Sequence, residues 1–123
     1  MDNDSKSNEI SSLEKFTINA FKEKQPVSFT KYFSSDYIGV ANDGVKDAAA
    51  EIKGMLKLDI KEIRVLDERI SFPENNLGIM TYTMAVTGKL NEQDISGEIY
   101  CSTVYLKKAS GWQSILHTES KAG

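Results

Sequence analysis

The chain has 123 residues, of which 40% are hydrophobic and 27% charged, and its 18 acidic and 15 basic side chains leave a formal net charge of -3. This length fits one domain with its own core, and the acidic balance argues against a nucleic-acid-binding protein, which needs a basic face. No apolar run reaches the ~18–20 residues of a membrane span, and the polar start lacks the features of a signal peptide. We therefore expect a cytoplasmic domain without nucleic-acid or membrane partners.

The first third of the chain is predicted to be helical. Residues 1–8 are polar and are expected to form a flexible N-terminus, followed by one folded domain over residues 9–121. From about Ser7 a helical period places a set of apolar residues on one face and Glu14 on the opposite, solvent-facing side. The apolar set is Ile10, Leu13, Phe16, Ala20 and Phe21. Pro26 ends this helix, and a short second helix is predicted over Val27–Phe33.

A strand and a third helix follow. The strand is predicted at about Asp36–Ala41, and the turn after it, Asn42-Asp43-Gly44, has residues that tolerate or prefer positive φ. Apolar spacing then predicts a helix over Lys46–Leu58.

Beyond Asp59 the sequence becomes rich in Ile, Val, Thr and Tyr and predicts four long antiparallel strands. Three turn-like segments separate Ile60–Phe72, Leu77–Leu90, Ile95–Lys107 and Trp112–Lys121. Strands of this length twist and curl. Helices followed by a meander of strands predict an α+β fold, with the helices packed on one face of a curved sheet.

The turn positions predict a register for the hairpins. Centring one hairpin on Glu92-Gln93 places Gly88 opposite Gly97, and centring the last on Ala109-Ser110 places Thr103 opposite Leu116. The inner face then carries Met80, Tyr82, Met84, Val86, Ile99, Cys101, Thr103, Tyr105, Trp112 and Leu116, with no carboxylate. For the first long strand, Leu66, Ile70 and Phe72 fall on the outer face unless a one-residue bulge reverses them.

The outer face of the predicted sheet is too apolar to be left uncovered, and a second copy of the chain is the simplest cover. We therefore expect a homodimer. The residues assigned to its interface are Thr81, Thr83, Tyr100, Ser102, His117 and Glu119.

The order of elements and the closing segment resemble a known superfamily. The segment is Gly97-x5-Thr103-x-Tyr105-x-Lys107-x3-Gly111-Trp112-x4-His117-x2-Ser120, and the stretch from Phe33 to Val40 with the Asp43-Gly44 turn matches a first strand. From about Glu9 to Ser120 the chain resembles nuclear transport factor 2-like proteins, in particular small SnoaL-like or ketosteroid-isomerase-like domains of unknown function. The resemblance implies a strongly curved antiparallel sheet wrapped around the helices as a cystatin-like cone, an apolar pocket at its mouth and frequent dimers. Because members include isomerases, cyclases, dehydratases and proteins without known activity, it leaves the function open.

Aromatic residues crowd into the first 40 positions, where the helices cover the sheet. With hydroxyl-bearing and methionine side chains of the inner face they are typical of a pocket for a small apolar or aromatic molecule. The predicted lining residues are Phe16, Tyr32, Tyr37, Met80, Tyr82, Met84 and Trp112.

Catalytic candidates are few. Isomerase-type chemistry needs a carboxylate base in an apolar cavity and a neutral donor opposite. Asp36 and His117 are the weak candidates for the base, with a tyrosine as donor, although parity favours the outer face for His117 unless a bulge reverses it. Because Cys101 is the only cysteine and His117 the only histidine, we expect no metal and no cofactor.

The sequence thus predicts a dimeric small-molecule-binding domain without an assembled catalytic site. Two alternatives stay open. One is an enzyme of the isomerase, cyclase or dehydratase kind that uses Asp36 or His117. The other is an association module that binds no ligand.

Overall fold

The computed structural model describes residues 2–122 of the chain. Its three helices are α1 (Asp2–Lys22), α2 (Pro26–Phe29) and α3 (Ala48–Lys57). Its strands are β1 (Phe33–Ala41), β2 (Gly44–Lys46), β3 (Leu58–Glu74), β4 (Leu77–Leu90), β5 (Gln93–Asp94), β6 (Gly97–Lys108) and β7 (Gly111–Lys121). No helix within residues 2–122 combines the length and the apolar character needed to cross a membrane.

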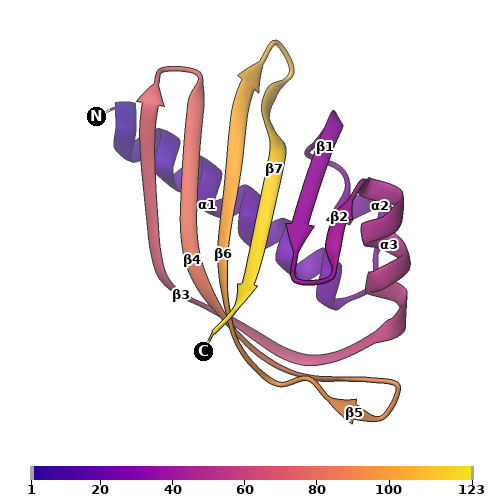
Figure 1. Ribbon diagram of the computed structural model, residues 1–123. Coiled ribbons are helices and arrows are strands. Elements are labelled where there is room, and N and C mark those ends of the chain that lie inside the picture. Colours follow the sequence, from indigo (N-terminus) through magenta and orange to yellow (C-terminus); the bar gives the residue numbers. More distant parts are fainter. Residues whose placement is uncertain (1, 123) are drawn as a thin grey trace.

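The strands form one seven-stranded sheet in the order β2-β1-β7-β6-β4-β3, with β5 paired to β4. All neighbours are antiparallel except β1 and β7, which run parallel. The sheet curves strongly, and α1 crosses one face of it diagonally while α2 and α3 lie beyond the β1–β2 edge (Figure 1). The α+β architecture and the curved, cone-like sheet predicted from the sequence are confirmed.

Helix α1 begins at Asp2, five residues earlier than the predicted start, so residues 2–8 form its first turns. Lys6 lies over the ring of Phe72 on the sheet, 5.6 Å from the ring centroid. The helix ends where Lys24 adopts a φ of 56°, two residues before Pro26, which cannot continue it. Asp47 caps α3, since its side chain accepts a hydrogen bond from the backbone N–H of Ala50 at 2.9 Å.

The register of the β4–β6 hairpin differs from the prediction by two residues. Gly97 pairs with Val86 instead of Gly88, because the hairpin turns at Asn91 and Glu92, one residue before the predicted turn. Both turn residues have positive φ, and the short strand β5 pairs with β4 directly after them. A shift of two residues keeps every side chain on its face. The inner face therefore carries Met80, Tyr82, Met84, Cys101 and Thr103 as expected, all of them buried.

Two β-bulges determine which side chains of β3 and β7 face the core. In β3 the register shifts between Leu66 and Arg69, where Asp67 has a φ of 55°, and the shift turns Ile70 and Phe72 toward the core. In β7 the pairing passes from Tyr105–Ser114 to Val104–Leu116, which leaves Ile115 as an extra residue. Thr103 therefore pairs with His117, and the predicted Thr103–Leu116 pair is wrong.

The core lies between α1 and the inner face of the sheet. Its largest cluster joins Ile10 of α1 to buried side chains of β4, β6 and β7, among them Met80 and Trp112. A second, smaller cluster of Ala20, Phe29 and Met55 packs the three helices together. Between these clusters the packing is interrupted by polar side chains.

Candidate functional site: a chamber with buried charges

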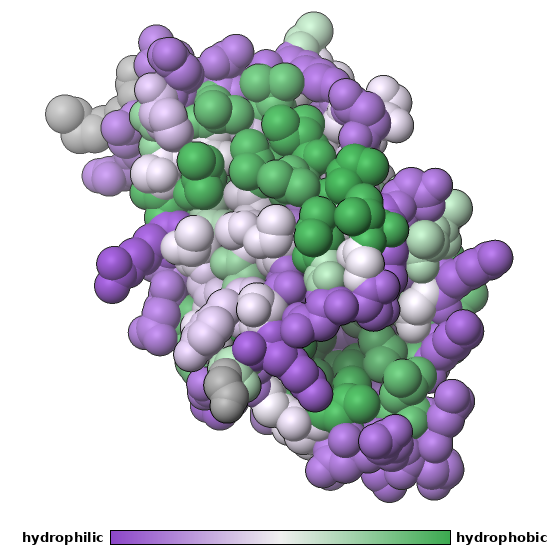
Figure 2. All heavy atoms as spheres, in the orientation of Figure 1, coloured by the Kyte–Doolittle hydropathy of each residue, from purple (hydrophilic) through white to green (hydrophobic). Residues whose placement is uncertain are grey.

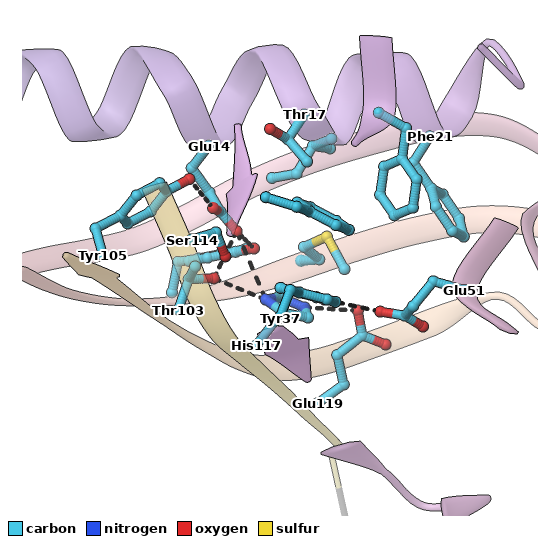
Figure 3. Close-up of a pocket in the computed structure, with 15 residues that line it drawn as sticks. Glu14, Thr17, Phe21, Tyr37, Glu51, Thr103, Tyr105, Ser114, His117 and Glu119 are labelled. Carbon is cyan, nitrogen blue, oxygen red and sulfur yellow. Dashed lines mark hydrogen bonds and ion pairs between the residues drawn. The ribbon is translucent and has the colours of Figure 1, made fainter. Parts of the chain in front are cut away.

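A small chamber of about 50 Å³ lies under the second half of α1, between the helices and the inner face of the sheet (Figure 3). Its apolar wall consists of Ile18, Phe21, Phe29, Phe33 and Met84. Its polar wall consists of Glu14, Thr17, Tyr37, Glu51, Tyr82, Thr103, Tyr105, Ser114, His117 and Glu119. Three carboxylates and the only histidine of the chain thus meet around one small space.

The deepest carboxylate belongs to Glu14, whose residue is only 4% exposed. It accepts hydrogen bonds from the hydroxyls of Tyr82, of Tyr105 at 2.6 Å and of Thr103 at 2.7 Å. Burying an ionised carboxylate costs several kcal/mol unless hydrogen bonds replace its water. The three hydroxyls supply that replacement, and they tie α1 to β4 and β6.

The imidazole of His117 joins two of the carboxylates. Its Nδ1 lies 2.7 Å from Thr103 Oγ1 and 3.7 Å from Glu14 Oε2, while its Nε2 lies 2.9 Å from Glu119 Oε2. Because the Thr103 hydroxyl donates its proton to Glu14, its oxygen can only accept from Nδ1–H. A carboxylate likewise accepts from Nε2–H. This hydrogen-bond pattern makes His117 an imidazolium that carries both protons.

The surroundings of His117 favour the same protonation state. Burial alone would lower the pKa of His117, but hydrogen bonds with Cys101 and Glu119 and the charges of Glu14 and Glu119 hold this pKa well above its usual value. Burial and the neighbouring Glu14 carboxylate raise the pKa of the Tyr82 and Tyr105 hydroxyls. Both tyrosines therefore stay neutral donors. Its raised pKa and its two hydrogen bonds favour His117 as a proton donor in this chamber.

A second polar pair lies nearer the opening. The Tyr37 hydroxyl donates to Glu51 Oε2 at 2.9 Å, and burial together with the charge of Glu119 raises the pKa of Glu51. Glu51 lies against the bare backbone of Gly39, where a Cβ atom would stand 2.6 Å from Glu51 Oε2. Glycine at position 39 thus makes room for this carboxylate.

Two further spaces adjoin the chamber. One, of about 310 Å³, lies between α3, β1 and the ends of β6 and β7, and another, of about 110 Å³, lies between α1 and β3, β4 and β6. Phe21 and Glu119 line both of them as well as the chamber. Phe21, which projects from the end of α1 in Figure 3, therefore stands between a charged chamber and a larger, mainly apolar compartment. We call the 310 Å³ space the outer compartment.

Cys101, His117 and Glu119 form the one group within residues 2–122 that could hold a metal ion, with ligand atoms within 4.8 Å of one another. The present arrangement does not suit that role, because Nε2 of His117 already forms a hydrogen bond with Glu119. Burial also raises the pKa of the Cys101 thiol, whereas a metal ligand must be a thiolate.

The structure places three of the seven predicted pocket residues, Tyr37, Tyr82 and Met84, at the chamber. Phe16 and Tyr32 lie outside it. They pack edge to face with ring centroids 5.6 Å apart, and Phe16 is 41% exposed because the buried stripe of α1 runs along a different line. Met80 and Trp112 also lie outside the chamber, since both are buried in the core under the first half of α1.

The two catalytic candidates lie in different environments. His117 lines the chamber, whereas Asp36 is exposed on β1 and accepts a hydrogen bond from Ser34, which lowers the pKa of Asp36. Asp36 therefore does not belong to this chamber. The expectation that the inner face carries no carboxylate is wrong as well, because Glu119 lies on it.

The outer face of the sheet carries four of the six residues predicted for the dimer interface. Thr81, Thr83, Tyr100 and Ser102 lie there, but the bulge at Ile115 turns His117 and Glu119 inward and Leu116 and Thr118 outward. Figure 2 views this face and shows hydrophobic residues gathered over its upper half, with more polar ones below. A row of cross-strand neighbours contributes to the apolar part: Ile79, Val104, Leu116 and Ile38.

Glu14 and Glu51 were missed by the sequence reasoning. The buried stripe of α1 runs through Ile10, Glu14, Thr17 and Phe21, so Glu14 stands one turn after a fully buried isoleucine. Glu51 stands one turn before the fully buried Met55. The sequence feature that could have identified them is an acidic residue one helical turn from an apolar residue, and therefore on the same helix face.

No protein-family model matches the sequence, and no curated protein matches it. Solved structures match over nearly the whole chain. An NTF2-like protein from Cytophaga hutchinsonii has a TM-score of 0.85 at 13% identity, covering 94% of this chain and 98% of that one. The hexachlorocyclohexane dehydrochlorinase LinA-type3 from Novosphingobium barchaimii has a TM-score of 0.85 at 12% identity, covering 99% and 90%.

A ketosteroid isomerase-like protein from Erwinia carotovora atroseptica has a TM-score of 0.80 at 10% identity, covering 93% of this chain and 94% of that one. Sequence identities this low do not transfer an activity, and the structural matches show the fold alone. The chain has the nuclear transport factor 2-like fold, as its resemblance to that superfamily implied.

Proposed function

We propose, on the premise of this fold and this chamber, that the domain binds a small, mainly apolar molecule. The body of the ligand lies in the outer compartment, and its polar group reaches past Phe21 to the chamber. The chamber alone is too small for more than a few atoms, whereas ligand sites usually measure roughly 300–1,000 Å³. The outer compartment, at about 310 Å³, has the size for the body.

The observation that carries this proposal is the buried chain Glu14–Thr103–His117–Glu119, set at the base of an apolar compartment. Buried ionic groups are often replaceable by apolar side chains with no loss of stability, so packing does not account for them. Charged groups with shifted pKa values in a cavity are typical of functional sites. Binding of the polar group of a ligand accounts for the presence of these charged residues in the interior.

Gly54 offers a direct test of this location. It lines the outer compartment from α3, and a Cβ atom at this position would meet nothing within 4 Å. Gly54→Leu should therefore fill the compartment while leaving the helix intact. Nile red, an uncharged apolar dye, should gain fluorescence with the wild-type protein and lose most of that gain with Gly54→Leu.

The matched control is Ala49→Leu, which adds a similar side chain at an exposed position of the same helix. Equal dye binding by both variants and the wild type would show that the compartment is not the binding site.

Acid–base catalysis is a second candidate, favoured by the pairing of Glu51 with His117 in one chamber. Glu51 has a raised pKa and is a stronger base than an ordinary carboxylate, and the imidazolium of His117 can return a proton. This assignment replaces the combination of a histidine base with a tyrosine donor, since Tyr82 and Tyr105 already donate to Glu14. A bound molecule should then exchange a C–H proton with deuterated solvent, and Glu51→Gln should abolish the exchange.

The outer sheet face supports a third element of the proposal, that two copies of the chain pair through it. Ile79, Val104, Leu116 and Ile38 form a continuous apolar row across four strands, beside hydroxyl groups that can hydrogen-bond to a partner. Apolar patches of this kind mark association surfaces. A homodimer would cover the face without any other partner.

A further inference from the structure

The hydrogen-bond donors around the chamber are almost all in use. Among residues 2–122, the hydroxyls of Tyr82, Tyr105 and Thr103 donate to Glu14, and that of Tyr37 donates to Glu51. Both N–H groups of His117 are directed at Thr103 and Glu119. These six groups make up most of the donors around the chamber that a ligand could otherwise use.

Two lining hydroxyls remain. Thr17 donates to the backbone carbonyl of Leu13 at 2.9 Å, which leaves Ser114 as the one lining hydroxyl for which residues 2–122 show no side-chain hydrogen bond. Ser114 is buried on β7, next to the inner end of the chamber. A ligand that carries only acceptor atoms would therefore find one donor at most.

Acceptor capacity, in contrast, is available where a ligand enters. A carboxylate has two oxygens with about four lone-pair positions. Within the described residues, the hydrogen bonds of Glu51 and Glu119 all involve Oε2, so Oε1 of each is left over. Both carboxylates line the outer compartment as well as the chamber, so an entering polar group meets them first.

The cations near the opening do not reverse this balance. Lys46 and Lys121 also line the outer compartment, but Lys46 lies 2.7 Å from Asp43 and forms an ion pair with it, and Lys121 stands at the exposed end of β7. His117 is already held between Glu14 and Glu119.

We propose that the ligand presents a hydrogen-bond donor, a hydroxyl or an amino group, on an apolar body, and that Glu51 and Glu119 accept from it. This inference rests on the binding function proposed above and names the chemical class of its ligand. Carboxylates and phosphates are disfavoured, because they would face Glu51 and Glu119 at close range, while Lys46 and His117 are already paired with carboxylates of the chain. Ketones and ethers are disfavoured, because a polar group buried without a partner loses its hydrogen bonds to water.

Four probes with the same eight-carbon body test the inference: 1-octanol, octylamine, 2-octanone and octanoate. Their dissociation constants are measured by displacement of Nile red at pH 7. 1-Octanol and octylamine should bind about tenfold more tightly than 2-octanone, and octanoate should bind most weakly. Equal or tighter binding of 2-octanone or octanoate would overturn the donor assignment and leave the binding function standing. Failure of all four probes to displace the dye would overturn both.

Glu51→Gln supplies a second readout, because the amide adds two N–H donors in nearly the same volume. This variant should gain about three- to tenfold in affinity for 2-octanone and lose preference for 1-octanol. The control is Glu62→Gln, an exposed position of β3 at which the same substitution should leave all four affinities unchanged. An unchanged preference in Glu51→Gln, with a melting temperature like that of the wild type, would contradict the role of this carboxylate.

Discussion

Glu14 and Tyr105 are 91 positions apart in the chain, and a hydrogen bond of 2.6 Å joins them. The carboxylate comes from α1 and the hydroxyl from β6, so this contact fastens the first helix to the middle of the sheet. It also fixes the carboxylate that stands beside Nδ1 of His117. Stability and the charge of the chamber therefore depend on the same bond.

Tyr105→Phe should lower the free energy of unfolding by about 1–3 kcal/mol, because it removes one of three donors from a buried carboxylate. Urea denaturation measures the change. Tyr32→Phe is the matched control, since Tyr32 lies outside the chamber, no hydrogen bond of its hydroxyl is seen within residues 2–122, and the loss of this hydroxyl should change stability by less than about 0.5 kcal/mol. Equal effects of the two substitutions would refute the structural role of the Glu14 network.

The raised pKa of His117 predicts how stability depends on pH. The folded chain binds the imidazole proton more tightly than the unfolded chain, whose histidine titrates near pH ~6.5. The resulting stabilisation is fully present below that pH and is lost as pH rises through the folded pKa. Urea denaturation between about pH 6 and pH 9 should show this loss, and His117→Gln should remove it. An NMR titration that placed the folded pKa at or below ~6.5 would contradict the prediction.

Phe21→Ala should join the chamber to the outer compartment, because Phe21 lines both. The variant should accept ligands with a bulkier group next to the donor, at a cost in stability of about 2 kcal/mol for the half-buried ring. Binding of 1-octanol and of 2-phenylethanol, measured by dye displacement, should show 2-phenylethanol gaining relative to the wild type. Phe16→Ala removes the same ring from outside the chamber and should leave the two affinities in their original ratio.

Leu116→Arg places a charge in the centre of the outer apolar row and should split the proposed homodimer. Light scattering after gel filtration should give the mass of two chains for the wild type and of one chain for the variant. Val27→Arg, at an α2 position that is 86% exposed, should keep the mass of two. A wild-type protein with the mass of one chain at micromolar concentration would reject the dimer.

Alternation of apolar and polar residues predicts most of the inner face. Tyr82, Met84 and Thr103 lie where the pattern places them, because an error of two residues in register does not change the face. His117 and Glu119 could not be placed in this way, since one bulged residue, Ile115, reverses everything after it. Nothing in the residue types around Ile115 marks the bulge.

The buried position of Glu14 could not be predicted for a different reason. Two stripes can be drawn on α1: the predicted apolar set that includes Phe16, which leaves Glu14 facing solvent, and the stripe that runs from Ile10 through Glu14 to Phe21. The sheet below selects the second stripe, because the hydroxyls of Tyr82, Tyr105 and Thr103 stabilise a carboxylate there. A helical period read alone carries no information about such partners.

The bulge at Ile115 also bears on how such a pocket can change over generations. Deleting this single codon would remove the extra residue between the Tyr105–Ser114 and Val104–Leu116 pairs, so plain alternation would return with His117 and Glu119 still facing inward. One residue inserted between Leu116 and His117 in a regular strand would instead move His117 and Glu119 to the outer face and alter the surface available to a second copy. Gain or loss of one residue after the bulge is therefore the shortest route by which relatives of this fold could acquire or discard an acid–base interior.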